Sequence, residues 1–396
     1  MTSPLSGVTV VDLTRVLSGP YCTMMLADMG ARVIKIEQPG KGDDTRGWGP
    51  PFVNGESAYF LSINRNKESL TLDLKKPGAR PILESLLGGA DVLVENFRPG
   101  AMERLGFGYE QVAMRWPRVI YCSISGFGHS GPRREEAGYD AVVQAEGGLM
   151  SITGAADGPP FRLGVAISDI VSGMFAAHGI AFALLARERT GRGQRVDIGM
   201  LDATAALLTY QAGIFFATGQ TPGRMGNRHP TIVPYETFPA ADGEFVVAVG
   251  NDEQWRRFCN VLGASDLEQD DRFATNRGRV GHYDTLRPML VDRLRTRPRE
   301  EWVRALKAAG VPCGSVREVG EVLTDEHLQA RNMIETVEHA VAGAIKVLGV
   351  PIKLSDTPGG VSTPPPTLGQ HTEKILSDDL GLSATDIADL RAAAAI

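Results

Sequence analysis

Short apolar runs alternate with helical segments over the first 125 residues, and this alternation limits the chain to few folds. Residues 8–12 form a run typical of a buried strand, and Pro20 and Gly30 suit the first turn and the end of a helix. Residues 32–37 add a second strand-like run and complete a βαβ unit. The pattern continues with strand-like runs at 70–74, 91–95 and 118–125 and a helical segment at 77–87. It predicts a parallel sheet with helices on both faces.

A second domain is expected where this alternation stops. Residues 168–189 and 200–216 are predicted helices, and the Gly- and Pro-rich segment 219–234 resembles a linker. A strand-like run at 244–249 and several charged helices follow, with Trp255 and Trp302 as the expected core anchors. We therefore predict a smaller domain over residues 225–325.

Charge and cysteine content argue against several kinds of partner. The net charge of −6 argues against a basic face for nucleic acid. The four cysteines lie far apart, so neither a disulfide framework nor a zinc site is expected. The first eleven residues lack the basic region of a signal peptide, and Asp169 and His178 interrupt the most apolar stretch, 165–185. We expect a cytoplasmic protein without a membrane span.

The loops after the predicted strands are candidates for a ligand site, because ligands of open α/β sheets bind at the carboxyl ends of the strands. These loops are rich in Gly, Pro and polar residues, and three carry a nearby cation; they are 13–20, 38–44, 96–100 and 126–131. They favour a phosphorylated ligand, although Gly and Pro also simply make turns. Residues 126–131 match G-x-G-x-x-G, but a charged segment rather than an apolar helix follows them, which argues against an NAD enzyme.

Asp169 is the most informative carboxylate. It stands where a strand-like run passes into a long, nearly all-apolar helix. An Asp in a first helical turn interacts well with the helix dipole, so local sequence alone favours a structural role. We expect the same interaction to keep the carboxylate ionised in a partly dry site, as a carboxylate nucleophile requires. His129, His178 and His229 lack metal-ligand spacing.

Taken together, these segments resemble the class III CoA-transferase family over nearly the whole chain. The motifs that carry the resemblance run in order from residue 12 to residue 314. They are residues 12–16 (DLTRV), 19–20 (GP), 30–37 (GARVIKIE), 42–46 (GDDTR), 64–67 (NRNK), 72–75 (LDLK), 94–100 (VENFRPG), 105–106 (LG), 190–194 (TGRGQ) and 310–314 (GVPCG). One such motif would be weak, but the ordered set is specific.

The resemblance implies a fold and a nucleophile. The fold would be a Rossmann-like large domain over residues 1–220 and 330–396, a smaller α+β domain over 225–325, and two chains interlocked in a homodimer. The family's catalytic aspartate precedes a Gly- and Ala-rich helix, which is the position of Asp169. This favours the nucleophile over the structural role.

The resemblance also implies where coenzyme A would bind as a substrate; no tightly bound cofactor is expected. Lys75 and Arg104 would pair with phosphates. Gln38 stands where the family often has Arg, and Leu17 stands where formyl-CoA transferase has Gln, which argues against formyl or oxalate chemistry. The matching CoA-binding positions are Arg15, Val16, Leu72, Lys75, Asn96, Phe97, Arg98, Arg104, Tyr139 and Asp140.

The implied chemistry is CoA transfer through covalent intermediates on Asp169, first a mixed anhydride and then an aspartyl-CoA thioester. A carboxylate is already ionised at neutral pH, so no general base is needed. The sequence does not specify the donor or the acceptor. Arg228, His229, Gly250 and Asn251 lie where the small domain would face the site, and Arg228 suggests a dicarboxylic acid such as succinate.

Two alternatives share the fold. An α-methylacyl-CoA racemase needs two acid/base groups, and the family's racemases pair the aspartate with a His in Ala-Gly-His-Asp. Here that segment reads Ala-Gly-Tyr-Asp at 137–140. A tyrosine hydroxyl ordinarily titrates near pH ~10 and is a poor base at neutral pH, which favours the transferase. A non-catalytic acyl-CoA-binding protein is the second alternative, and the presence of Asp169 counts against it.

Overall fold

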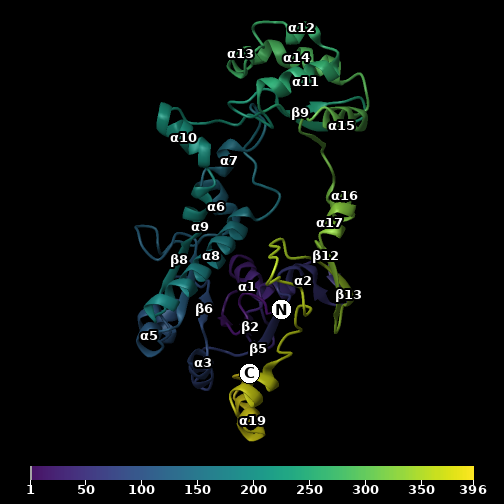
Figure 1. Ribbon diagram of the computed structural model, residues 1–396. Coiled ribbons are helices and arrows are strands. Elements are labelled where there is room, and N and C mark those ends of the chain that lie inside the picture. Colours follow the sequence, from purple (N-terminus) through teal and green to yellow (C-terminus); the bar gives the residue numbers. More distant parts are fainter. Residues whose placement is uncertain (1) are drawn as a thin grey trace. The chain divides into compact units, whose positions relative to one another are not determined.

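The computed structural model describes residues 2–396 and divides into two compact units (Figure 1). The first unit runs to Leu149, resumes over Arg162–Gly213 and ends with Glu326–Ile396. The second unit comprises Met150–Phe161 and Ile214–Asp325. The short segment Met150–Phe161 thus joins the second unit although it lies far from the rest of that unit in sequence.

A six-stranded sheet forms the centre of the first unit, in the order β5-β2-β1-β6-β7-β8. Each neighbouring pair is parallel, which confirms the predicted parallel α/β fold. The strand order reverses between β1 and β6, so the switch point of a doubly wound sheet lies there. The strands are β1 (Thr9–Asp12), β2 (Arg32–Glu37), β5 (Lys67–Thr71), β6 (Val92–Glu95), β7 (Ile120–Ser125) and β8 (Arg195–Gly199).

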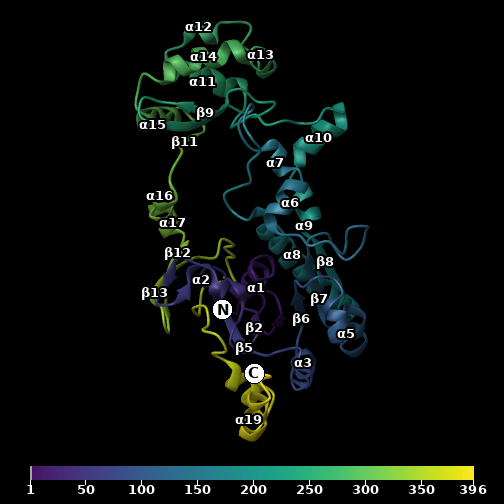
Figure 2. The same cartoon turned by 180° about the vertical axis from the view of Figure 1, so that it is seen from behind.

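Helices cover both faces of this sheet. Alternate strand residues point to opposite faces, and the apolar side chains on each face pack against helices. Val10 and Val94 pack against α1, α6 and α8, whereas Val11 and Leu93 pack against α3, α4, α5 and the C-terminal helices. Helix α8 lies beside β7 and β8 in both views (Figures 1 and 2). The helices are α1 (Ser18–Asp28), α3 (Ala79–Gly88), α4 (Ala101–Leu105), α5 (Tyr109–Arg115), α6 (Asp140–Glu146), α8 (Ile167–Thr190), α18 (Thr372–Lys374) and α19 (Ala384–Ala392).

Helix α8 is long and apolar enough to cross a membrane by length and composition, as core helices of globular proteins also are. Ala176 and Ile180 on one of its faces are fully buried in the core. A side chain at Gly173 would come within 2.5 Å of the Ser18 carbonyl oxygen, so glycine is needed for the contact with α1. This close approach brings the first turns of α1 and α8 together.

Three predicted elements differ from the structure. The strand predicted at 70–74 is β5, which begins earlier, at Lys67, and ends at Thr71. The helix predicted over 200–216 is broken into α9 (Met200–Ala206) and α10 (Thr209–Thr218), which meet at a bend of 75°. Strand β8 was not predicted, because its short sequence, RVDIG, is half polar and lies at the edge of the sheet.

The edge strand β5 is covered by the C-terminal segment of the first unit. The Ser69 N–H donates to Nδ1 of His371 (3.1 Å), and the Thr71 N–H donates to Oγ1 of Thr372 (3.0 Å). Capping of these edge amides protects the sheet from pairing with another chain. The remaining elements of this unit are α2 (Ala58–Ile63), α17 (Glu326–Ala330), η1 (Asp44–Gly47), η2 (Ile375–Asp379), β3 (Phe52–Val53), β4 (Glu56–Ser57), β12 (Ile334–His339) and β13 (Gly343–Leu348).

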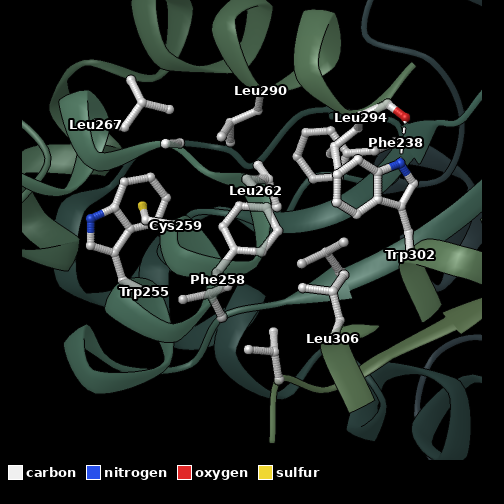
Figure 3. Packing of buried hydrophobic residues seen from close by; sticks show 14 of the residues in the cluster. Phe238, Trp255, Phe258, Cys259, Leu262, Leu267, Leu290, Leu294, Trp302 and Leu306 are labelled. Carbon is white, nitrogen blue, oxygen red and sulfur yellow. Dashed lines mark hydrogen bonds between the residues drawn. The ribbon is translucent and has the colours of Figure 1, made fainter. Parts of the chain in front are cut away.

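The second unit has its own core beneath a three-stranded antiparallel sheet, in the order β11-β10-β9. Trp255 and Trp302 are each 1% exposed, which confirms them as core anchors, and Trp302 donates from Nε1 to the Leu294 carbonyl at 2.7 Å (Figure 3). Its elements are β9 (Tyr235–Pro239), β10 (Glu244–Ala248), β11 (Cys313–Ser315), α11 (Asp252–Leu262), α12 (Ser265–Glu268), α13 (Asn276–Gly281), α14 (Tyr283–Leu294), α15 (Arg299–Ala308) and α16 (Val319–Leu323). Helix α7 (Leu149–Ile152) begins at its boundary.

Candidate active site

The loops that follow β1 and β6 are tied together at the switch point of the sheet. Oδ1 of Asn96 accepts a hydrogen bond from the Arg15 N–H (3.0 Å), and Nδ2 of Asn96 donates to the Arg15 carbonyl (2.7 Å). The Arg15 guanidinium also lies 5.4 Å from the centre of the Phe97 ring. Arg15, Asn96 and Phe97, all predicted site residues, therefore lie together.

Two buried charged residues, Lys35 and Asp43, bind the loop that follows β1. Lys35, fully buried, donates to the Thr14 carbonyl (2.8 Å) and to the Asp43 carboxylate (2.9 Å). Burial alone would raise the pKa of Asp43, but Lys35 and Thr45 lower it to about 2. The other Asp43 oxygen accepts from the Val16 N–H at 3.2 Å. Val16 has a φ of 69°, a strained conformation for a β-branched residue, and these contacts stabilise it.

One cavity lies over the carboxyl ends of β1, β2 and β5, with a volume of about 380 Å³. Five of the residues predicted to bind CoA line it, and Lys75 and Arg104 are both exposed at its wall. Lys41 also lines it and pairs with Asp44 at 2.5 Å. The five predicted residues are Arg15, Leu72, Lys75, Phe97 and Arg104.

A second cavity of about 210 Å³ lies over the carboxyl ends of β6 and β7 and contains Asp169. The two cavities share Arg15, Asp44 and Phe97, so they adjoin at the Phe97 loop. Ser18, from the candidate loop 13–20, lines it as well, together with Ser125 and Met200, which were not predicted. The other predicted residues on its wall are Val16, Asn96, Arg98 and Tyr139.

Asp169 occupies the first turn of α8 and is partly buried. Burial, followed by the charge of Asp140, raises the pKa of Asp169 to about 7, and a hydrogen bond from Ser18 opposes this rise. The expectation of a carboxylate fully ionised at neutral pH was therefore wrong. The first turn of α8 lies against α1 and beside a second carboxylate, and neither neighbour was visible in the local sequence.

Asp140 lies beside Asp169 rather than on the wall of either cavity. Oδ1 of Asp140 accepts from the Ser168 N–H at 2.9 Å, and Oδ2 accepts from Gln144 at 2.8 Å. Burial and the charges of Asp169 and Asp140 raise the pKa of Tyr59 to about 12, so this phenol stays neutral near Asp169. Tyr59 was not predicted, because it lies in α2, a short helix without a recognisable motif.

The predicted substrate residues lie in the second unit. The Arg228 guanidinium lies 3.4 Å from the centre of the Tyr283 ring, and its buried Nε has no hydrogen-bond partner among residues 2–396. Nδ1 of His229 accepts from the Thr231 N–H at 3.2 Å. Asn251 caps α11 through the Gln254 N–H (2.9 Å), so its side chain already has a structural role, and the Gly250 N–H donates to the Gln254 side chain.

Other chemistries find less support in this geometry. Between Gly131 and α6 the described chain has no helix, so G-x-G-x-x-G at 126–131 lacks the context of a dinucleotide site. Within residues 2–396, no group of three His, Cys, Asp or Glu side chains could hold a metal ion. The arrangement instead offers a partly buried carboxylate, Asp169, in one cavity and cations at the wall of the adjoining cavity.

The sequence and the structure are similar to those of known proteins. The family described as CoA-transferase family III matches residues 5–372. The succinate–glutarate CoA-transferase of Agrobacterium fabrum is 42% identical over 381 residues, which cover 95% of each chain. The acetyl-CoA:oxalate CoA-transferase of Acetobacter aceti is 46% identical over 353 residues, or 89% of each chain. A crystal structure of a CaiB/BaiF family protein from Brucella suis is 40% identical, with a TM-score of 0.86 over 96% of this chain and 100% of that one.

Proposed function

The chain belongs to CoA-transferase family III, and we propose that it transfers CoA from an acyl-CoA thioester to a free carboxylic acid through covalent intermediates on Asp169. The observation that carries the role of Asp169 is its place in the second cavity, which adjoins the first at Phe97. The first cavity would hold the nucleotide of CoA, with Lys75 and Arg104 near its phosphates. The thioester would then reach Asp169.

The proposed reaction conserves atoms and charge. The ionised Asp169 attacks the thioester carbonyl. The CoA thiolate departs as the leaving group, and a mixed anhydride forms between Asp169 and the donor acid. The thiolate attacks the Asp169 side of the anhydride, which releases the donor acid and forms an aspartyl-CoA thioester. The acceptor carboxylate attacks this thioester and expels the thiolate, which then attacks the acceptor's carbonyl carbon. The acceptor leaves as its CoA thioester, and the Asp169 carboxylate is regenerated without a general base.

The groups around Asp169 suit this chemistry. Ser18 donates a hydrogen bond to the carboxylate and would orient it for attack. The apolar side chains of Leu17, Ile63 and Ile170 belong to one cluster with Val16, which lines the second cavity, and this cluster would exclude water from the reactive anhydride. A site of this kind protects an intermediate that water would otherwise hydrolyse.

We propose dicarboxylic acids as the substrates. The relatives described above are named for succinate, glutarate and oxalate, so oxalate stays a candidate despite Leu17. Arg228 supports the same substrates, because its stacking on Tyr283 fixes a guanidinium whose Nε has no protein partner in the described chain. Such a group would bind the second carboxylate in a bidentate pair.

We propose that the protein acts as an interlocked homodimer. Phe175, Phe182 and Leu185 lie on one face of α8, and their side chains are 41%, 69% and 62% exposed. Large apolar side chains grouped on one helix are typical of a subunit interface. Sedimentation of the full chain at micromolar concentration would give the mass of a dimer, whereas a monomer would contradict this proposal.

An exchange assay tests the proposed function. Labelled succinate is incubated with succinyl-CoA, with glutaryl-CoA or with no thioester, and label in the CoA ester is measured. We expect exchange with both thioesters and a loss of at least about 1,000-fold in Asp169→Asn. Exchange that survives in this variant would contradict the role of Asp169. Loss of the α-proton of an acyl-CoA without any exchange would favour the racemase instead.

The dicarboxylate proposal has a matched pair of acids, since succinate and butyrate both have four carbons. Arg228→Ala should raise the KM for succinate by about 10- to 100-fold, as expected for a lost charge-assisted pair, and leave butyrate nearly unchanged. Arg277→Ala, an exposed arginine of the same unit, serves as the control. An equal effect on both acids would contradict the proposed contact.

A further inference from the structure

Glu95 is a buried carboxyl group that the proposed chemistry does not use. It is the last residue of β6, at the switch point of the sheet, and only 2% of it is exposed. Burial raises the pKa of Glu95 to about 7. A buried carboxyl group lowers the stability of the fold unless hydrogen bonds or charges compensate it. We therefore ask which groups Glu95 contacts.

The carboxyl group binds the loop that follows it. Oε2 of Glu95 accepts a hydrogen bond from the Phe97 N–H at 2.9 Å. The next side chain, Asn96, binds both backbone groups of Arg15. Glu95 and Asn96 together therefore fix the loop 96–99 to β6 on one side and to the loop after β1 on the other.

This loop separates the two cavities of the candidate site. Phe97 lines both of them, and Asn96, Arg98 and Pro99 line the second. A CoA molecule with its nucleotide in the first cavity and its thioester at Asp169 has to pass this loop. Phe97, with Arg15 and Asp44, lines both cavities, so a shift of the Phe97 backbone would change the path between them.

We infer that Glu95 is the positioning residue of the 96–99 loop and thereby sets the affinity of the enzyme for CoA. The inference rests on the proposed binding of CoA across the two cavities. Glu95 does not touch the substrate; it acts through the Phe97 N–H, which an ionised carboxylate binds more strongly than a protonated one does. The loop should loosen as Glu95 takes up a proton, so the affinity for CoA should fall when the pH is lowered from 8 to 6.

The titratable and charged groups near Glu95 come from four neighbouring segments, and they include the buried thiol of Cys122 in β7. Nε2 of His129, in the loop after β7, lies 3.8 Å from Oε1 of Glu95, and this nitrogen has no hydrogen-bond partner among residues 2–396. Burial lowers the pKa of His129, which disfavours the charged imidazolium that would compensate the carboxylate. The other titratable or charged groups are Glu103 of α4, Arg195 of β8 and Tyr121 of β7.

The test measures the binding of CoA by titration calorimetry at pH 6 and pH 8, in the wild-type protein and three variants. Glu95→Ala removes the acceptor and should weaken binding by about tenfold at pH 8. Glu95→Gln keeps an acceptor that does not titrate, so it should bind at pH 8 within about threefold of wild type and lose most of the pH dependence. Glu103→Gln, the control, removes a charge that helps to raise the pKa of Glu95, so it should keep the pH dependence but move its midpoint to lower pH.

The outcomes separate this inference from the proposed function. If wild type does not bind CoA, the proposed function fails. If wild type binds CoA and Glu95→Ala binds equally well, the inference is overturned. A Glu95→Gln protein with the pH dependence of wild type would also overturn it, and this variant preserves the shape of the side chain, so it remains informative if Glu95→Ala does not fold. A merely structural role of Glu95 would lower thermal stability without changing the pH dependence of binding.

Discussion

Asp140 and Asp169 are neighbouring carboxylates. Asp140 accepts a hydrogen bond at 2.9 Å from the N–H of Ser168, the residue before Asp169, and this contact keeps the two side chains close. Like charges in one site disfavour each other's ionised form, so Asp140 helps to raise the pKa of Asp169 to about 7. The proposed nucleophile is therefore half protonated near neutral pH in the free protein. A carboxylate that is less strongly stabilised as an anion is also a better nucleophile, so the pair favours attack on the thioester once the proton has left.

The pH profile of the transfer reaction tests this pair. Only the ionised Asp169 can attack, so kcat/KM should rise with pH and reach half its maximum near pH 7. Asp140→Asn removes the like charge and should move the midpoint to lower pH, because less repulsion opposes ionisation of Asp169. Initial rates from pH 5 to 9 give both midpoints. An unchanged midpoint in this variant would show that Asp140 does not influence the nucleophile.

The raised pKa of Asp169 predicts that its ionised carboxylate lowers the stability of the folded protein. The folded-state pKa of Asp169, about 7, lies above its unfolded value, so the group favours folding at low pH and opposes it as the pH rises through 7. Asp169→Asn should therefore be more stable than wild type at pH 8, by up to ~4 kcal/mol. The difference should shrink toward pH 5. Urea unfolding at both pH values measures it, and a variant less stable than wild type at pH 8 would contradict the prediction.

Lys75 and Lys76 allow a test of the first cavity with neighbouring residues. Both are exposed, but only Lys75 lines the cavity. Lys75→Gln should raise the KM for acyl-CoA about three- to tenfold, and less at high salt, because a phosphate contact is screened. Lys76→Gln should have little effect. Steady-state kinetics at low and high salt decide this, and equal effects of the two substitutions would remove the cavity from the proposed CoA site.

Trp302 and Trp255 provide a second matched pair, in the core of the second unit. Each is 1% exposed, but the Trp302 N–H donates to Leu294 at 2.7 Å whereas the Trp255 N–H is buried with no partner in the described chain. Trp302→Phe loses a hydrogen bond and leaves a carbonyl unpaired, so it should cost about 1–3 kcal/mol more than Trp255→Phe. Chemical denaturation followed by circular dichroism measures both. The reverse order would contradict the buried hydrogen bond of Trp302.

The sequence predicted the sheet well because β1, β6 and β7 are short, largely uncharged runs buried on both faces, and β2 places Val33, Ile34 and Ile36 among its charged residues. Strand β8 was missed because an edge strand can be half polar. The break between α9 and α10 was also missed, since it contains neither Gly nor Pro, and Thr209, the first residue of α10, takes a φ of 38° that its sequence does not announce.

The sequence predicted which loops form the candidate site, but it did not predict the distances, burial and charge interactions of their side chains. Arg15, Asn96 and Phe97 follow two strands that are neighbours in the sheet, so the topology alone brings them together. The protonation of Asp169 could not be predicted, because it depends on burial against α1 and on Asp140, which lies 29 residues earlier in the chain. Ser18 lies in the candidate loop 13–20 and Glu95 in the motif 94–100, but their roles depend on contacts with other elements.

The most direct test of the central claim is mass spectrometry of the protein after incubation with succinyl-CoA. An aspartyl-CoA thioester would add CoA to the peptide that contains Asp169, and hydroxylamine would release it and leave a hydroxamate on that residue. We expect this adduct in the wild-type protein and its absence in Asp169→Asn. An adduct on another residue, or CoA exchange without any adduct on Asp169, would contradict covalent catalysis by this carboxylate.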